Sequence, residues 1–277
     1  MTKTAAVVDR SELRVPETEF VARTPIRPAF LPQWLTLTER SLRSMVAEGE
    51  FVSAVVAPLV FALGFYLPLR IVMEDRGLDY AQFLMPIIVL QAMTFTALSA
   101  AQRSAMDSVR GMSKRLQTMP VGPLTPLAAR MSVALVRSAV SLFASIVYGY
   151  VLGFRFVGPS ANILYFCAFA LVFSLVLSLG ADAIGLLSKS PEASGQALVL
   201  PQMILGMLST GFVPESGFPE WARPFARNQP ISHFSAAMRD MATGTLTWPT
   251  LVPALLWAAG LAAVFVPLAL WAGARRS

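Results

Sequence analysis

The chain has 277 residues, of which 55% are hydrophobic and only 14% are charged, and its mean hydropathy is +0.61. A soluble globular domain carries about a quarter charged residues, so this composition excludes an ordinary aqueous protein. It also excludes a disordered chain, which needs low hydrophobicity. The formal net charge is +6, but the basic residues lie in short connections between apolar runs and do not indicate nucleic-acid binding. The single cysteine, Cys167, excludes an internal disulfide framework.

The first fifty residues divide into two parts. Residues 1–32 mix acidic and basic side chains with several prolines and lack the apolar core of a secretory signal, so we expect a flexible cytosolic tail. Residues 33–50 are expected to form an amphipathic connecting helix in the membrane interface. A plain cytosolic extension of the first span is the alternative. The apolar side of this helix would consist of Trp34, Leu35, Leu42, Met45 and Val46.

The remainder of the chain, 51–277, reads as a six-helix transmembrane domain. A bilayer core of roughly 30 Å needs about 20 apolar residues per helix. Lipid leaves the α-helix as the only plausible state for such segments, because every backbone polar group must be paired within the segment. The sequence therefore predicts an all-α polytopic membrane protein. Its predicted spans are 51–69, 81–102, 131–154, 158–181, 193–214 and 251–271.

The distribution of Lys and Arg predicts the orientation of the spans. With the N-terminus inside, the inner segments carry sixteen basic residues and the outer segments six. Cytoplasmic loops are enriched in basic residues, so we expect both termini in the cytoplasm of a multi-pass protein of the plasma (inner) membrane.

The inner connection between spans two and three, 103–130, contains a helical pattern over 105–119. Its apolar stripe consists of Ala105, Val109, Met112, Leu116 and Met119, and Pro120 ends it. The charged residues Asp107, Arg110, Lys114 and Arg115 avoid the stripe. A basic amphipathic helix at this place either lies on anionic lipid or docks a cytosolic partner that pushes on the membrane domain.

The outer connection, 215–250, is aromatic and broken by prolines, so we expect short half-helices at the outer headgroup level. His233 is the only histidine and has no Cys or His companion, which argues against a metal site. We therefore expect this histidine to lie at the surface or to cap a helix.

Motifs that would indicate catalysis or the binding of a nucleotide or metal are absent from the sequence. There is no phosphate loop, dinucleotide fingerprint, nucleophile elbow or zinc-binding pair of histidines. The clear ionisable residues within the predicted spans are Arg137 and, at the edge of span four, Asp182. Both are expected on the inner side, where a structural ion pair or independent solvation is favoured over a proton relay. We therefore expect no catalytic, cofactor-binding or metal-binding residue in this chain.

Those absences separate the classes of membrane protein. A proton-coupled transporter would place carboxylates or histidine at mid-depth and often shows an internal repeat, and neither is found. An intramembrane enzyme would need converging polar residues, which are missing too. A membrane domain driven by a separate cytosolic ATPase needs only a docking helix and a pathway, and usually a second copy.

Three segments also resemble a known family. The runs RLQTMPVGPLTPLAAR at 115–130, GYVLGFRF at 149–156 and FARNQPISHFSAAMR at 225–239 resemble type-2 ABC exporter (ABC-2) permeases. The nearest branch is that of the daunorubicin/doxorubicin-resistance membrane subunits (DrrB-like), with actinobacterial relatives that export cell-envelope lipids. The similarity covers roughly 40–277, and NQPIS at 228–232 is its most specific element.

The resemblance implies a permease that works as a homodimer or heterodimer with a cytosolic ABC ATPase subunit (DrrA-like), which uses the ATP and Mg. It makes 33–50 the connecting helix and places 105–119 in the coupling helix that contacts the ATPase. It also implies that the short outer helices close the pathway toward the exterior. The outer gate would then consist of Trp221, Phe225, Asn228, Gln229 and Pro230.

The function indicated by the sequence is therefore the permease subunit of an ABC exporter for a hydrophobic or amphiphilic substrate, either an anthracycline-type drug or a cell-envelope lipid. The alternatives are a single-chain multidrug or lipid transporter driven by an ion gradient, and a non-transporting membrane scaffold for lipid assembly.

Overall fold

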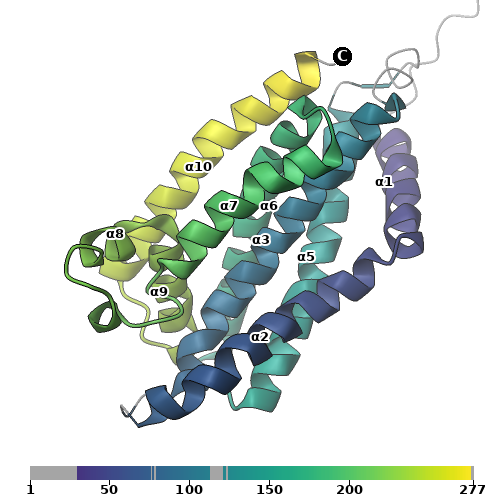
Figure 1. Ribbon diagram of the computed structural model, residues 1–277. Coiled ribbons are helices and arrows are strands. Elements are labelled where there is room, and N and C mark those ends of the chain that lie inside the picture. The colour runs from purple at the N-terminus through teal and green to yellow at the C-terminus, as the bar shows by residue number, and fades with distance from the viewer. Residues whose placement is uncertain (1–29, 76, 78, 113–120, 123, 276–277) are drawn as a thin grey trace, which may run out of the picture.

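The computed structural model is a bundle of long α-helices that run back and forth between two ends (Figure 1). It describes residues 30–75, 77, 79–112, 121–122 and 124–275, and all regular structure in these ranges is helical. The predicted all-α polytopic class is thus confirmed for this part of the chain. The helices of the bundle are α2 (Glu50–Glu74), α3 (Tyr80–Val109), α5 (Thr125–Leu152), α6 (Ser160–Leu187), α7 (Pro191–Met207) and α10 (Trp248–Arg275).

Five of these helices, α2, α3, α5, α6 and α10, are long and apolar enough to cross a membrane, counted over the described residues. The remaining bundle helix, α7, has 17 residues and corresponds to the predicted fifth span. Several helices extend past the charge-free runs that defined the predicted spans. Glu50, Arg103 and Asp182 all remain helical, because a long or paired side chain at a helix end can keep its charge compensated while the backbone ladder continues.

The predicted connecting helix is present as α1 (Phe30–Ala47), shifted by three residues relative to 33–50. The predicted tail, 1–32, lies outside the described residues except for its last three, which begin α1. Gly49 separates α1 from α2 with a φ of 71°, a left-handed conformation that glycine adopts without strain. The chain therefore changes direction at one residue just before Glu50.

Helix α3 is the centre of the bundle and packs against α2, α5, α6, α7 and α9. Its closest neighbour is α6, where Gly185 lies against the backbone of Ala101. A Cβ atom at Gly185 would overlap the Ala101 carbonyl oxygen and lie 2.9 Å from its Cα. The two helices approach this closely because residue 185 has no side chain, and the approach brings the polar ends of α3 and α6 together.

The two ends of the bundle differ. At one end, here called the charged end, α3, α6 and α10 terminate, α2, α5 and α7 begin, and α1 packs alongside (Figure 1). The opposite end, the α8–α9 end, carries a 3-10 turn (Glu215–Gly217), α8 (Arg223–Asn228) and α9 (Pro230–Thr243). The short helices predicted within 215–250 are therefore confirmed.

Helix α9 is fixed to the bundle by an arginine and an aromatic side chain. The Arg239 guanidinium donates to the Phe83 carbonyl at 3.1 Å and lies 3.9 Å from the Phe83 ring centroid. Burial lowers the pKa of Arg239 to about 10, so the group stays charged at neutral pH. Phe234 is fully buried and packs on Phe173, with ring centroids 4.7 Å apart. The α8–α9 end is thus held by the buried Arg239 guanidinium together with ring packing.

Candidate functional site

The charged end contains a fully buried carboxylate. Asp182 on α6 is 0% exposed and accepts two hydrogen bonds from the Arg130 guanidinium of α5, at 2.6 Å and 3.0 Å. The hydroxyl of Ser104 on α3 also donates to it. A bidentate arginine–carboxylate pair with a further donor is the geometry in which a buried ion pair can offset its desolvation cost. This group therefore ties three helices together at one point.

A second carboxylate, Glu50, begins α2 and joins two arginines. Its Oε2 lies 2.7 Å from Nη1 of Arg103 on α3 and 3.1 Å from Nη1 of Arg137 on α5. Arg137 also donates to the Glu50 main-chain carbonyl at 2.7 Å and to the Ser53 hydroxyl at 3.0 Å. Because Glu50 directly follows the bend at Gly49, the end of α1 is linked through this residue to both α3 and α5.

The predicted ion pair between Arg137 and Asp182 is wrong in its partners. Asp182 pairs with Arg130, and Arg137 pairs with Glu50. The reason is depth along the helices. Arg130 is the sixth residue of α5 and Asp182 the sixth from the end of α6, so the two lie at one level. Arg137 lies seven residues further along, on the order of 10 Å deeper.

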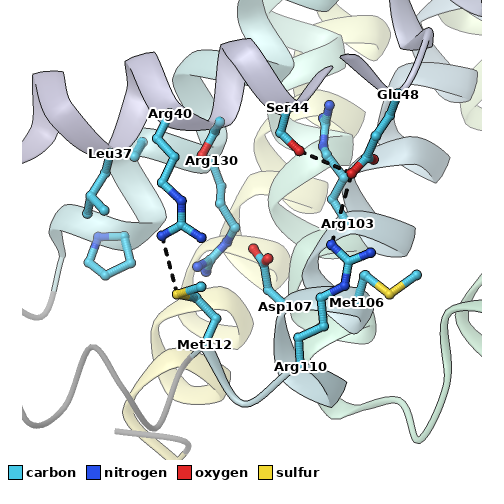
Figure 2. A pocket seen from close by; sticks show the side chains of 13 residues that line it. Leu37, Arg40, Ser44, Glu48, Arg103, Met106, Asp107, Arg110, Met112 and Arg130 are labelled. Carbon is cyan, nitrogen blue, oxygen red and sulfur yellow. Dashed lines mark hydrogen bonds and ion pairs between the residues drawn. The ribbon is translucent and has the colours of Figure 1, made fainter. Parts of the chain in front are cut away.

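A polar cleft of about 150 Å³ lies between α1, the end of α3 and the beginning of α5. Figure 2 shows Asp107 in its middle, with its carboxylate between the guanidinium groups of Arg130 and Arg110. From α1, Arg40 enters the cleft and contacts the Met112 sulfur at 3.4 Å, and Glu48 lies 4.0 Å from Arg110. Asp107 makes no direct ion pair or hydrogen bond with another described residue, but the nearby guanidinium groups of Arg130, Arg40 and Arg110 stabilise its charge.

The structure places only part of the predicted docking element. Asp107, Arg110 and Met112 line the cleft, and Val109 is 58% exposed beside it. Lys114, Arg115 and Leu116 lie outside the described residues. A single helix over 105–119 is wrong, because α3 ends at Val109 and Gly111 takes a left-handed φ of 71°. The local glycine therefore outweighs the helical spacing of the apolar residues.

The five residues predicted as an outer gate differ in exposure. Trp221, Phe225 and Asn228 are exposed on or next to α8, with Trp221 at 83%. Gln229 is buried, and neither its amide nitrogen nor its amide oxygen has a hydrogen-bond partner. Pro230 begins α9. The structure therefore gives these residues different surroundings, and a shared gating role stays a prediction.

The sequence reasoning missed Glu50, Arg103 and Arg130 as members of the site. The sequence places all three at the edge of an apolar run, Glu50 at the end of the predicted connecting helix and Arg103 and Arg130 in the inner connection. Their common signal was available, because acidic and basic residues stand at the same predicted inner end of successive spans. What the sequence could not supply is which of those helix ends touch one another.

The arrangement has no catalytic chemistry. The described residues contain no group of three or more His, Cys, Asp and Glu side chains able to hold a metal ion. The charged end instead forms a rigid surface in which acidic and basic side chains pair with one another. Force applied to α1 or to the end of α3 would pass through Glu50 and Asp182 into four helices of the bundle.

Comparison with known proteins gives consistent matches. The family described as ABC-2 family transporter protein matches residues 66–271. The doxorubicin resistance ABC transporter permease protein DrrB of Mycobacterium tuberculosis is 39% identical over 239 residues, which cover 81% of this chain and 83% of that protein.

Two further relatives are more distant. The probable doxorubicin resistance ABC transporter permease protein DrrC of Mycobacterium tuberculosis is 28% identical over 100% of this chain and 99% of its own length. The daunorubicin resistance ABC transporter permease protein DrrB1 of Streptomyces coeruleorubidus is 28% identical over 82% of this chain and 81% of that protein.

Proposed function

The chain belongs to the ABC-2 family of transporter proteins, and from this we propose that it is the permease subunit of an exporter driven by a separate ATPase. It is a multi-pass protein of the cell membrane and, as a permease subunit, lacks ATPase activity of its own. ATP and Mg²⁺ are used by the partner subunit, and this chain binds no cofactor. The substrate is hydrophobic or amphiphilic and moves outward.

The observation that carries this proposal is the double ion-pair system at the charged end. Two carboxylates join the starts of α2 and α5 to the ends of α3 and α6, with α1 attached through the bend at Gly49. An ATPase that works from outside the membrane needs a stiff element through which its movement reaches several helices. A substrate pathway alone would not require charges tied together at one end.

The ATPase docks beside the polar cleft in this proposal. Val109 supplies an exposed apolar anchor, and Asp107, Arg110 and Met112 lie next to it in the cleft. Buried apolar anchors carry most of the energy of an interface, and charges at its rim guide the encounter. Lys114, Arg115 and Leu116 follow directly in the sequence, and we assign them to the same contact.

We further propose six crossings with both termini inside. Helix α6 ends at the charged end and α10 begins at the α8–α9 end, so the chain between them must pass from one end to the other. Helix α7 makes that passage with 17 residues, roughly 26 Å of helix. The excess of basic residues in the connections at the charged end favours a cytoplasmic location for it.

We infer the substrate and the partner proteins from the names of the relatives. Two relatives are named for doxorubicin resistance and one for daunorubicin resistance, so an anthracycline-type drug is the first candidate substrate and a cell-envelope lipid the second. The ATPase would be DrrA-like, and a second permease, identical or homologous, completes the pathway in the bilayer. The outer gate of this pathway is assigned to the α8–α9 end.

An ion-gradient mechanism finds less support. The carboxylates of the described helices of the bundle all lie toward helix ends; they are Glu50, Glu74, Asp107, Asp182 and Glu192. A proton or sodium path through the membrane needs ionisable groups at mid-depth. None of the predicted spans contains an ionisable group at mid-depth.

Reconstitution with the cognate ATPase in vesicles tests the proposal. We expect outward movement of daunorubicin that requires ATP and the ATPase and persists when an ionophore collapses the ion gradients. Transport that continues without the ATPase and stops with the ionophore would instead establish the ion-gradient mechanism.

Cysteine labelling tests the orientation separately. A cysteine at Ser216, which is exposed at the α8–α9 end, should react with an impermeant reagent from outside intact cells, and one at Thr36 on α1 should not. The opposite labelling pattern would place the charged end outside and remove the docking assignment.

A further inference from the structure

An apolar groove follows α6 between α7 and α10, is lined in part by α3, and ends against α9. Its floor consists of Phe173, Leu177, Ala181 and Ile184 of α6, and its volume is about 210 Å³. The groove exists because α7 packs on α3 and only lightly on α6, whereas α10 packs closely on α6 (Figure 1). The space between the two flanking helices is therefore not filled by the protein.

The lining of the groove fits a purely apolar ligand. Thr94 and Gln202 are the polar residues among those that line it. The Thr94 hydroxyl already donates to the Leu90 carbonyl at 2.9 Å, so it needs no partner in the groove. The charged clusters described above contribute no residue to it. A ligand with a charge or several hydrogen-bond donors would lose its solvation there without compensation.

The residues around the groove indicate which molecules its opening faces. Helix α7 exposes Leu200 and Met203, and α10 exposes Leu256 and Val264, so both flanking helices present large apolar side chains to the outside. The floor helix α6 and the wall helix α10 are among the helices long enough to cross a membrane. The groove consequently opens at the depth of the bilayer where lipid acyl chains are the surrounding solvent.

The shape of the groove favours a chain over a ring system. The floor residues extend over eleven positions of α6, roughly 16 Å along the helix. A compact cavity of about 150 Å³ lined by Leu, Ile and Phe is enough to hold benzene. The groove distributes its 210 Å³ along about three turns of α6, an elongated shape that suits a flexible hydrocarbon chain.

We propose that this groove binds one acyl chain of a membrane phospholipid. The chain lies along the α6 floor between α7 and α10, and its far part reaches Pro230 and Phe234 at the beginning of α9. The bound chain completes the packing of α7 and separates it from α10 by a fixed width. The groove reaches Pro230 of the predicted outer gate, but its test measures lipid binding to the chain alone, so its outcome is separate from that of the proposed function.

Photo-crosslinking of the reconstituted full-length chain tests the proposal. The probe is a phosphatidylglycerol that carries a diazirine in the distal half of one acyl chain, and adducts are mapped by peptide mass spectrometry. We expect adducts on Leu177 and Ala181, which lie on the floor behind the flanking helices. Leu205→Trp, which fills the groove from α7, should lower these floor adducts roughly tenfold because it excludes several methylene groups.

Matched variants separate a specific site from general lipid contact. Leu200 is on the same helix but 65% exposed to the outside, so Leu200→Trp should leave the floor adducts unchanged. Leu261→Trp fills the groove from α10 and provides a second test if Leu205→Trp fails to accumulate. Adducts confined to the exposed faces of α7 and α10, with none on the floor residues, would overturn the proposal.

Discussion

The charged end and the α8–α9 end are built from different interactions. At the charged end, Glu50 and Asp182 each bind arginines from neighbouring helices, and the atoms involved have little or no exposure. At the α8–α9 end, Phe234 packs among aromatic rings while Trp221 and Phe225 remain exposed. One end therefore has few alternative arrangements, because an ion pair lost from a buried position is costly. At the other end, Arg239 and Phe234 hold α9 in place, but the exposed side chains of Trp221 and Phe225 can exchange one apolar contact for another.

This difference fits the two tasks of the proposed transporter. A junction that receives movement from a partner must transmit it without yielding. A gate at the exit of a pathway must open and close at low cost. Four substitutions test the contrast, beginning with the largest expected effect.

Asp182→Asn should destabilise the protein most. It leaves the Arg130 guanidinium without its carboxylate inside the bundle, and loss of one partner of a buried ion pair costs about 3–5 kcal/mol. We expect a large fall in the amount of folded protein, measured by size-exclusion chromatography and thermal unfolding in detergent. The transport rate per folded molecule should fall less.

The double variant Asp182→Leu/Arg130→Met is the control for that prediction. Replacing both charges by apolar side chains of similar size is often neutral, so it should recover much of the stability lost in the single variant. If the double variant is as unstable as Asp182→Asn, the ion pair is not the source of the effect.

Glu50→Gln should cost about 3 kcal/mol, at the lower end of the range for buried pairs, because Arg137 keeps its bonds to a main-chain carbonyl and to Ser53. Its larger effect should be on coupling, since Glu50 links α1 to α3 and α5. We expect ATP hydrolysis by the complex to continue while transport declines. Glu39→Gln, which breaks an exposed α1 ion pair with Arg43, should change neither quantity measurably.

Gly185→Ala should cost about 1–3 kcal/mol through overpacking, because its methyl group would press on the Ala101 backbone and separate α3 from α6 near Asp182. The melting temperature in detergent measures this effect. Gly64→Ala on α2, where no atom lies within 4 Å of the added Cβ, should be neutral or slightly stabilising. Equal losses in both variants would contradict the close α3–α6 contact.

Trp221→Ala should have the smallest effect on stability, within about 0.5 kcal/mol, because the ring is 83% exposed and not part of the buried core. A loss of transport with an unchanged melting temperature would support a role of the α8–α9 end in the pathway. A melting temperature as low as that of Asp182→Asn would show that this end is as rigid as the charged end.

The helices could largely be predicted from the sequence, because the bilayer thickness sets the length of an apolar run. The residues at which these helices begin and end could not be predicted. Arg130 was assigned to a loop, yet it lies within α5, since the helix continues as long as each charge finds a partner. The Arg137–Asp182 error has the same origin, because pairing depends on depth from the true helix ends. The break at Gly111 shows that one glycine can outweigh a regular apolar spacing.

The sequence predicts a polar cluster at the end of α3 but not the side chains that meet it, and its role in docking stays a prediction. Asp107, Arg110 and Met112 were expected at a partner-facing surface, and they line the cleft at the charged end. The roles of Arg40 and Glu48 could not have been read from the sequence, because they enter the same cleft from α1 and from the turn that follows it, some sixty residues earlier in the chain. Only the packing of α1 against α5 brings them there.

Cross-linking to the ATPase tests the central claim most directly, namely that the charged end receives the partner's movement. A cysteine at Val109 and, as the matched probe at the other end, one at Trp221 are placed in the reconstituted complex, and a thiol-reactive cross-linker is added with and without ATP. We expect Val109→Cys to link to the ATPase with a yield that changes on ATP binding, and Trp221→Cys to give no link. A link from Trp221→Cys and none from Val109→Cys would contradict the account.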